Sequence, residues 1–198
     1  MKNVIMGIAI TAIATTGCNN NSKSTTQKTA GNDNTKTDNT AVKTQTPGEG
    51  TTNSVVSIKP LIDHYLEMKN ALANDNGKEA AAHGTALNLA IEELGKSPLT
   101  ADQKKIYDDA AIDAKEHSEH IASNGSKIAH QREHFDMLST DIYDMVKAFG
   151  AGTVLYKDYC PMYNNKKGAI WLSGVNEIKN PYYGNKMLTC GIVKEEIK

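Results

Sequence analysis

Apolar residues recur every three or four positions from about residue 57 to Phe149, and this pattern constrains the fold more than any other feature of the chain. In the first segment, Leu61, Tyr65 and Leu72 fall on one face of a helix. Stretches containing Asn or Gly interrupt the pattern three times. We therefore expect four helices, over about 57–73, 78–94, 100–123 and from the 124–125 turn to Phe149.

Local signals at the helix ends support this division. Thr100 followed by Gln103 is the pattern of a capping box and indicates the start of the third helix. The connections between the four segments are short, and the segments are similar in length. An all-α, up-and-down four-helix bundle is therefore the expected fold.

The helical pattern ends at Gly150-Ala151-Gly152. The following residues are rich in Cys, Met, Tyr, Gly and Pro and show no long periodicity. We expect this C-terminal tail to be irregular and to pack on the bundle. Within it, a short extended segment is expected at 169–172 and a turn at 180–184.

The N-terminus carries the features of a secretory signal. Lys2 precedes an apolar stretch from Val4 to Ile13, and small residues lead to Gly17-Cys18. A signal peptide over 1–17 and lipid attachment at Cys18 are expected; the alternative is an ordinary signal peptide followed by a free cysteine. Residues 18–53 are mostly Thr, Asn, Lys and Ser and are expected to form a disordered tether. The folded domain is then expected over 54–198.

Composition and motifs exclude several function classes. The chain has 22 Lys and Arg against 23 Asp and Glu, with no basic stripe, which argues against nucleic-acid binding. It contains no Cys-x-x-Cys pair, no Gly-rich phosphate loop and no Ser/His/Asp motif of known context. We therefore expect no enzymatic activity.

Two short blocks of the tail place a thiol beside a thioether. Cys160 lies two residues before Met162, and Met187 lies three residues before Cys190. Thiolate and thioether ligands select Cu(I) and similar soft ions, so these four residues are candidate metal ligands. Outside the cytoplasm, however, two cysteines commonly form a disulfide. The residues alone leave both alternatives open.

Four of the six histidines fall on either side of the 124–125 turn. Counting outward from this turn brings His120 level with His130, and His117 level with His134. Imidazole is a common ligand of copper and zinc, so these four histidines are candidate nitrogen ligands. They would complete the sulfur site or form a second one. Asp113 lies one helical turn before His117 and is a candidate to orient it.

A simpler interpretation applies to each histidine: a hydrogen-bonded core residue or a solvated surface residue. His83 lies on the apolar stripe of its helix, whereas His130 lies off the centre of its own. His64 is expected to be structural.

Several motifs together resemble those of an uncharacterised helical family, domain of unknown function 3347. The run from His130 to Ser139 is similar to the family signature Gln-Arg-x-x-Phe-x-x-Leu-Ser. The tail adds four more segments in the same order: 160–162 (CPM), 168–173 (GAIWLS), 178–184 (IKNPYYG) and 187–191 (MLTCG). Family members occur as small Gram-negative lipoproteins and as domains appended to adaptor subunits of copper/silver efflux pumps. The resemblance implies a periplasm-facing protein connected with heavy metals.

From these observations we expect a lipoprotein that binds a soft metal ion for sequestration or transfer. Copper is favoured over zinc, an RND-type efflux adaptor is the expected partner, and the lipid anchor is expected to hold the protein to the outer membrane. The alternative is a disulfide-closed helical module that binds no metal and docks onto an efflux adaptor or another envelope protein.

Overall fold

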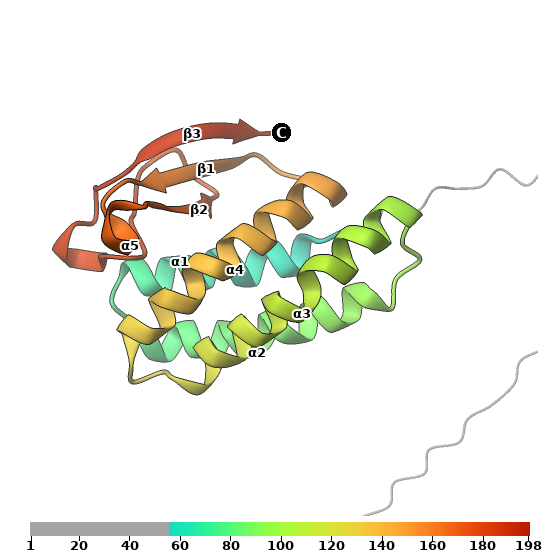
Figure 1. Ribbon diagram of the computed structural model, residues 1–198, viewed down its shortest axis with the longest axis horizontal. Coiled ribbons are helices and arrows are strands. Elements are labelled where there is room, and N and C mark those ends of the chain that lie inside the picture. Colours follow the sequence, from blue (N-terminus) through green and yellow to red (C-terminus); the bar gives the residue numbers. More distant parts are fainter. Residues whose placement is uncertain (1–55) are drawn as a thin grey trace, which may run out of the picture. The chain divides into compact units, whose positions relative to one another are not determined.

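The computed structural model describes residues 56–198 and contains the four predicted helices. They are α1 (Lys59–Ala73), α2 (Gly77–Gly95), α3 (Ala101–Ser123) and α4 (Ile128–Phe149). Each helix runs antiparallel to the one before it (Figure 1). The helical bundle predicted from the apolar pattern is confirmed.

The predicted signal peptide, the lipidated Cys18 and the tether lie outside the described residues. Among the helices of residues 56–198, none combines the length and apolar character that crossing a membrane requires.

Two of the four helices, α2 and α3, begin at a residue whose side chain caps the helix. The capping box of α3 is complete: the Thr100 hydroxyl accepts from the Gln103 amide at 3.2 Å, and the Gln103 side chain accepts from the Thr100 amide at 3.1 Å. At the start of α2, the Asn76 side chain accepts from the Glu79 amide. These bonds satisfy backbone N–H groups that have no partner inside the helix.

The core lies between the apolar faces of the helices. Tyr65 of α1 stacks on Phe135 of α4, with ring centroids 5.2 Å apart. Leu72, Leu87 and Ile121 are fully buried in the same cluster. Removing this apolar surface from water is the main contribution to the stability of the bundle.

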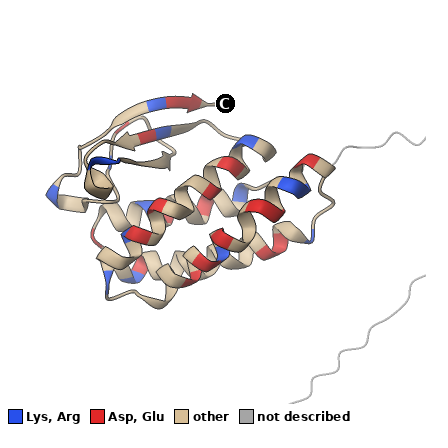
Figure 2. Ribbon diagram, viewed as in Figure 1, with Lys and Arg blue, Asp and Glu red and all other residues tan. Residues whose placement is uncertain are grey.

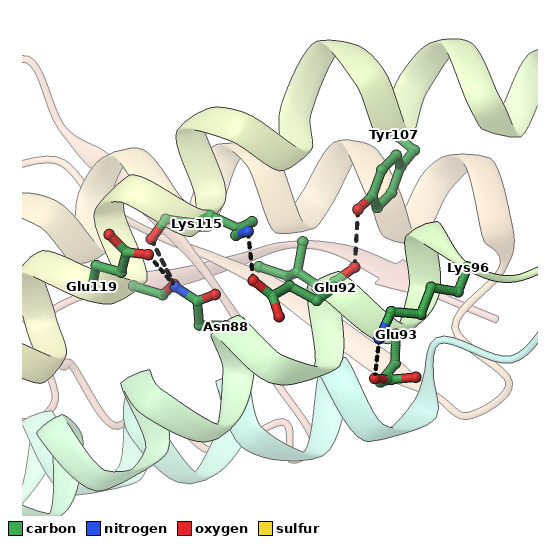
Figure 3. Close-up of polar contacts among 9 residues, drawn as sticks. Asn88, Glu92, Glu93, Lys96, Tyr107, Lys115 and Glu119 are labelled. Carbon is green, nitrogen blue, oxygen red and sulfur yellow. Dashed lines mark hydrogen bonds and ion pairs between the residues drawn. The ribbon is translucent and has the colours of Figure 1, made fainter.

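The outward faces of α2 and α3 are joined by polar contacts (Figure 3). Lys115 pairs with Glu92 at 2.7 Å, and the Asn88 amide donates to Glu119 at 3.0 Å. Acidic and basic residues are interspersed along these helices (Figure 2). Exposed pairs of this kind contribute little stability individually.

The tail is not irregular as predicted: it contains a three-stranded antiparallel sheet. Its strands are β1 (Leu155–Cys160), β2 (Ala169–Ser173) and β3 (Ile192–Ile197), in the order β2-β1-β3. The short helical turns α5 (Tyr163–Lys166) and η1 (Gly184–Lys186) lie in the connections. Only β2 was expected, as the extended segment at 169–172, and the expected turn before η1 is present.

The two missed strands have a physical explanation. β3 is an outer strand with a mostly exposed IVKEEI sequence, so it shows no alternation of buried and exposed residues. β1 is interrupted by a register shift between Lys157 and Asp158 and places the aspartate in the interior. The partner that β1 finds in β3 is distant in the sequence, and a local pattern cannot reveal such a pairing.

Two buried polar residues of α4 fasten the surrounding segments. Gln131 donates to the carbonyl oxygens of Gly77 at 2.8 Å and Ile121 at 2.9 Å. Its neighbour Arg132 donates to the carbonyls of Leu72 and Pro181, both at 2.7 Å. Arg132 therefore connects α4 with the end of α1 and with the tail.

Candidate metal centre

The end of α3 and the start of α4 bring four histidines together beside the turn that joins the two helices. His117 and His120 come from α3, and His130 and His134 come from α4. His120, His130 and His134 each offer one ring nitrogen, and these three nitrogens lie within 4.8 Å of one another. The convergence predicted by counting from the turn is therefore present.

The rings are packed against one another rather than only near in space. The His134 ring is stacked on that of His120, with centroids 4.1 Å apart and an interplanar angle of 4°. The His130 ring meets the His134 ring edge-on at 4.6 Å. His134 is thus the central member of the group.

His117 lies outside this trio and contacts it through His134. Its Nδ1 lies 3.2 Å from the Nδ1 of His134. In this contact one nitrogen must donate its proton and the other must accept it, so at least one of the two rings is held in a defined tautomer. The Nδ1 of His134 is then engaged, and Nε2 is left free to bind an ion. His117 is consequently placed to orient His134, a role that the sequence reasoning assigned to Asp113 acting on His117.

The surroundings of His117 and His134 favour the neutral form of these two imidazoles. Burial lowers the pKa of His117, and burial followed by the neighbouring histidines lowers that of His134. Neutral imidazole is the form that binds metal. The site therefore keeps these two rings competent to bind an ion at neutral pH.

Two glutamates that the sequence reasoning missed contact the outer histidines. Glu133 lies 3.4 Å from Nδ1 of His130, and Glu116 lies 3.9 Å from Nε2 of His120. Their spacings of three and four residues on a helix were the available signal. Asp113 is exposed, and within residues 56–198 no hydrogen bond joins it to His117.

The two cysteines meet elsewhere, between the end of β1 and the segment that precedes β3. Their sulfurs are 3.6 Å apart and unbonded, with Cys160 buried and Cys190 half-buried. Burial and the neighbouring Cys160 raise the pKa of Cys190, so the Cys190 thiol keeps its proton at neutral pH until an ion or an oxidant displaces it. Met162 is about half exposed, and Met187 is half-buried.

The sulfur and nitrogen groups do not form one cluster. Among the described residues, the histidine trio is the group of three or more His, Cys, Asp or Glu side chains close enough to share an ion. Within residues 56–198, no His, Asp or Glu lies close enough to the thiol pair to share an ion with it. Of the two arrangements expected from the sequence, the structure has two separate groups rather than one combined site.

The remaining histidines form a pair on the other side of the bundle. The rings of His64 in α1 and His83 in α2 are 5.9 Å apart, and both are half-buried. No third ligand joins them within residues 56–198. This pair provides a matched control for experiments on the trio.

Comparison with known proteins gives one match. The family model described as "Protein of unknown function (DUF3347)" matches residues 61–153, which cover the four helices and the start of the tail. No curated protein and no solved structure matches the chain.

Proposed function

We propose that this chain binds a transition-metal ion, copper in the first place, at the histidine site between α3 and α4. Residues 61–153 place the chain in the DUF3347 family, whose function is unknown. The observation that carries this proposal is the convergence of the His120, His130 and His134 nitrogens within 4.8 Å. Metal–nitrogen bonds of about 2.0–2.1 Å place two ligand atoms of one ion about 2.8–4.2 Å apart, depending on the angle between the bonds. Small rotations of the three side chains would bring these ring nitrogens to that separation.

The nature of the ligands supports copper. Imidazole suits copper, zinc, iron and nickel, and divalent copper binds most tightly to a given nitrogen site. Three protein ligands leave a further coordination position open. His120 is exposed at this site, so an incoming donor reaches the ion from solvent. Such a site suits the uptake and release of an ion rather than permanent structural binding.

Cys160 and Cys190 are proposed to form a second, softer site. The two unbonded sulfurs 3.6 Å apart have the separation of two ligands of one ion, since metal–sulfur bonds are about 2.3 Å long. Met162 and Met187 follow and precede these cysteines closely in the sequence and are the proposed thioether ligands. Thiolates and thioethers select Cu(I).

The cellular setting is part of the same proposal. The apolar stretch from Val4 to Ile13 and the Gly17-Cys18 junction support export and a lipid anchor at the periplasmic face of the outer membrane. An RND-type efflux adaptor is the proposed recipient of the ion. Labelling with a fatty-acid analogue should mark the wild-type chain and not Cys18→Ala; equal labelling of both would contradict the anchor.

Calorimetric titration of the purified full chain with Cu²⁺ and Zn²⁺ tests the histidine site. His120→Ala/His134→Ala should lose one equivalent of ion or weaken its binding by at least about a hundredfold, because mutating only a hydrogen-bond partner of a ligand already costs about 10–100-fold. The control His64→Ala/His83→Ala should match the wild type. If the two double variants bind with the same stoichiometry and affinity, the proposal is wrong.

The thiol site is tested separately by competition for Cu(I) under reducing conditions. Cys160→Ser/Cys190→Ser should lose Cu(I) binding while keeping its Cu²⁺ equivalent. The alternative, a disulfide-closed docking module that binds no metal, predicts a different result. The protein isolated without reductant should then have no titratable thiols, and no variant should change metal binding.

A further inference from the structure

A lysine is buried on the apolar face of α1, away from both metal-ligand groups. Lys69 is one of the buried residues of α1, and only 2% of it is exposed. Within residues 56–198 it forms no ion pair and no side-chain hydrogen bond. Keeping an ammonium on so deeply buried a side chain without a charge partner is costly.

The carboxylate that interacts most strongly with the charge of Lys69 also lacks a hydrogen-bond partner. Asp158 of β1 is fully buried, and neither of its oxygens has a hydrogen-bond partner in the described residues. The indole nitrogen of Trp171, opposite Asp158 on β2, has no partner of hydrogen-bond geometry in the described residues either, although it is close enough to lower the pKa of Asp158. Asp158 and Lys69 attract each other electrostatically, but no hydrogen bond joins them.

Lys69 opens onto a cavity of about 570 Å³ between α1 and the segments that follow β2. Its polar lining includes Asn70, Asn74 and Lys179 beside Lys69, with Glu67 of α1 also present. The Lys179 ammonium repels that of Lys69 and pairs with Glu177 at 3.2 Å. Pockets of this size hold small organic molecules, and a few polar groups within an apolar wall fix their orientation.

We propose that this cavity binds the oxyanion of a small organic molecule, a carboxylate or a phosphate. The Lys69 ammonium is the principal charge partner, and Lys179 is the second. Two ammonium groups that repel each other are both stabilised by an anion placed between them. The side chains of Asn70 and Asn74 can donate to the remaining oxygens, because neither is hydrogen-bonded to the described protein. Metal cations are disfavoured by the same two lysines, so this site is independent of the proposed metal centres.

The charged groups around Lys69 also predict how binding depends on pH. Burial lowers the pKa of Lys69 to about 8, and burial raises that of Asp158 to about 7. Glu67, Glu177 and Lys179 are the other charged groups that act on Lys69. Above about pH 8 Lys69 loses its charge, and affinity for the anion should fall.

Succinate and inorganic phosphate are suitable probes, added to the isotopically labelled full chain and followed by backbone amide chemical shifts. At pH 6.5 the shifts should move at Lys69, Asn70, Asn74 and Lys179, with saturation in the millimolar range. Saturation by succinate alone identifies a carboxylate ligand, saturation by phosphate alone a phosphate, and saturation by both identifies an oxyanion site. No saturable shift at these residues with either probe would overturn the proposal.

Substitutions separate a specific site from general attraction. Lys69→Met should weaken binding by about tenfold or more, as expected for the loss of a buried charge partner. Lys179→Met, at a more accessible position, tests the site without removing a buried group and should weaken binding by a smaller factor. Lys104→Met, on an exposed face of α3, is the control and should bind as the wild type does. Equal affinity in all three variants would contradict the assignment.

Discussion

Asp158 shows how a single buried side chain makes stability depend on pH. Burial raises the pKa of this carboxyl from 3.8 to about 7. Between about pH 4 and pH 7 the folded protein therefore binds more protons at this position than the unfolded chain does. The free energy of unfolding therefore decreases as the pH rises through this window.

Asp158→Asn should remove this dependence. From pH 5 to pH 8 the free energy of unfolding of the variant should fall less than that of the wild type, by about 1–3 kcal/mol. Urea denaturation at the two pH values measures the difference. The exposed Asp108→Asn is the control, and a wild-type slope in Asp158→Asn would contradict the burial of a titrating carboxyl. Asp141, whose pKa burial also raises, is present in all three proteins and does not affect the comparison.

Only part of this residue-scale information could be predicted from the sequence. The histidine cluster could be, because the spacing of His120 and His130 about a short turn fixes their relative height on two antiparallel helices. The burial of Lys69 could also have been predicted, because this charged residue lies on an otherwise apolar helical face. Asp158 carried none: its burial depends on a strand pairing that joins distant parts of the chain.

At the scale of elements, the helices follow from local sequence and the strands do not. The first turn of α3 shows the local contribution most directly. Thr100→Ala removes the hydroxyl that accepts from the Gln103 amide, and it should lower the free energy of unfolding by about 1 kcal/mol. Thr100→Ser keeps the hydroxyl and should remain within about 0.5 kcal/mol of the wild type. Equal destabilisation by both substitutions would show that the cap is not the cause.

The strands depend on contacts that only the folded molecule supplies. β1 has β2 on one side and β3 on the other, and its pairing with β3 spans more than thirty residues. β3 itself is exposed and charged, a composition that keeps the outer edge of a sheet from pairing with other chains. For this reason a search for short apolar runs finds β2 and misses β3.

At the scale of the whole molecule, Arg132 is the principal polar link between the bundle and the tail. It is the only arginine in the chain, and it pairs with Asp75 at 2.6 Å in addition to its bonds to the Leu72 and Pro181 carbonyls. The sequence placed it within the family-like motif but gave no role to it. Its partners lie in two separate segments, the end of α1 with the turn that follows it and the tail.

Arg132→Met should therefore loosen the tail before the bundle. We expect the free energy of unfolding to fall by about 2–4 kcal/mol, because carbonyl groups and a carboxylate lose a charged donor. Hydrogen exchange should accelerate at the amides of β1 and β2 more than at those of α2 and α3. The exposed Lys127→Met is the control; uniform acceleration across the molecule, or none, would contradict the role of Arg132 as a link.

The central claim is that imidazoles of α3 and α4 hold one ion. Electron paramagnetic resonance of the full chain with one equivalent of Cu²⁺ tests it most directly, because nitrogen couplings identify the ligands. We predict imidazole couplings in the wild type and in His64→Ala/His83→Ala, and their loss in His120→Ala/His134→Ala. A spectrum without imidazole couplings, or one unchanged in His120→Ala/His134→Ala, would contradict the account.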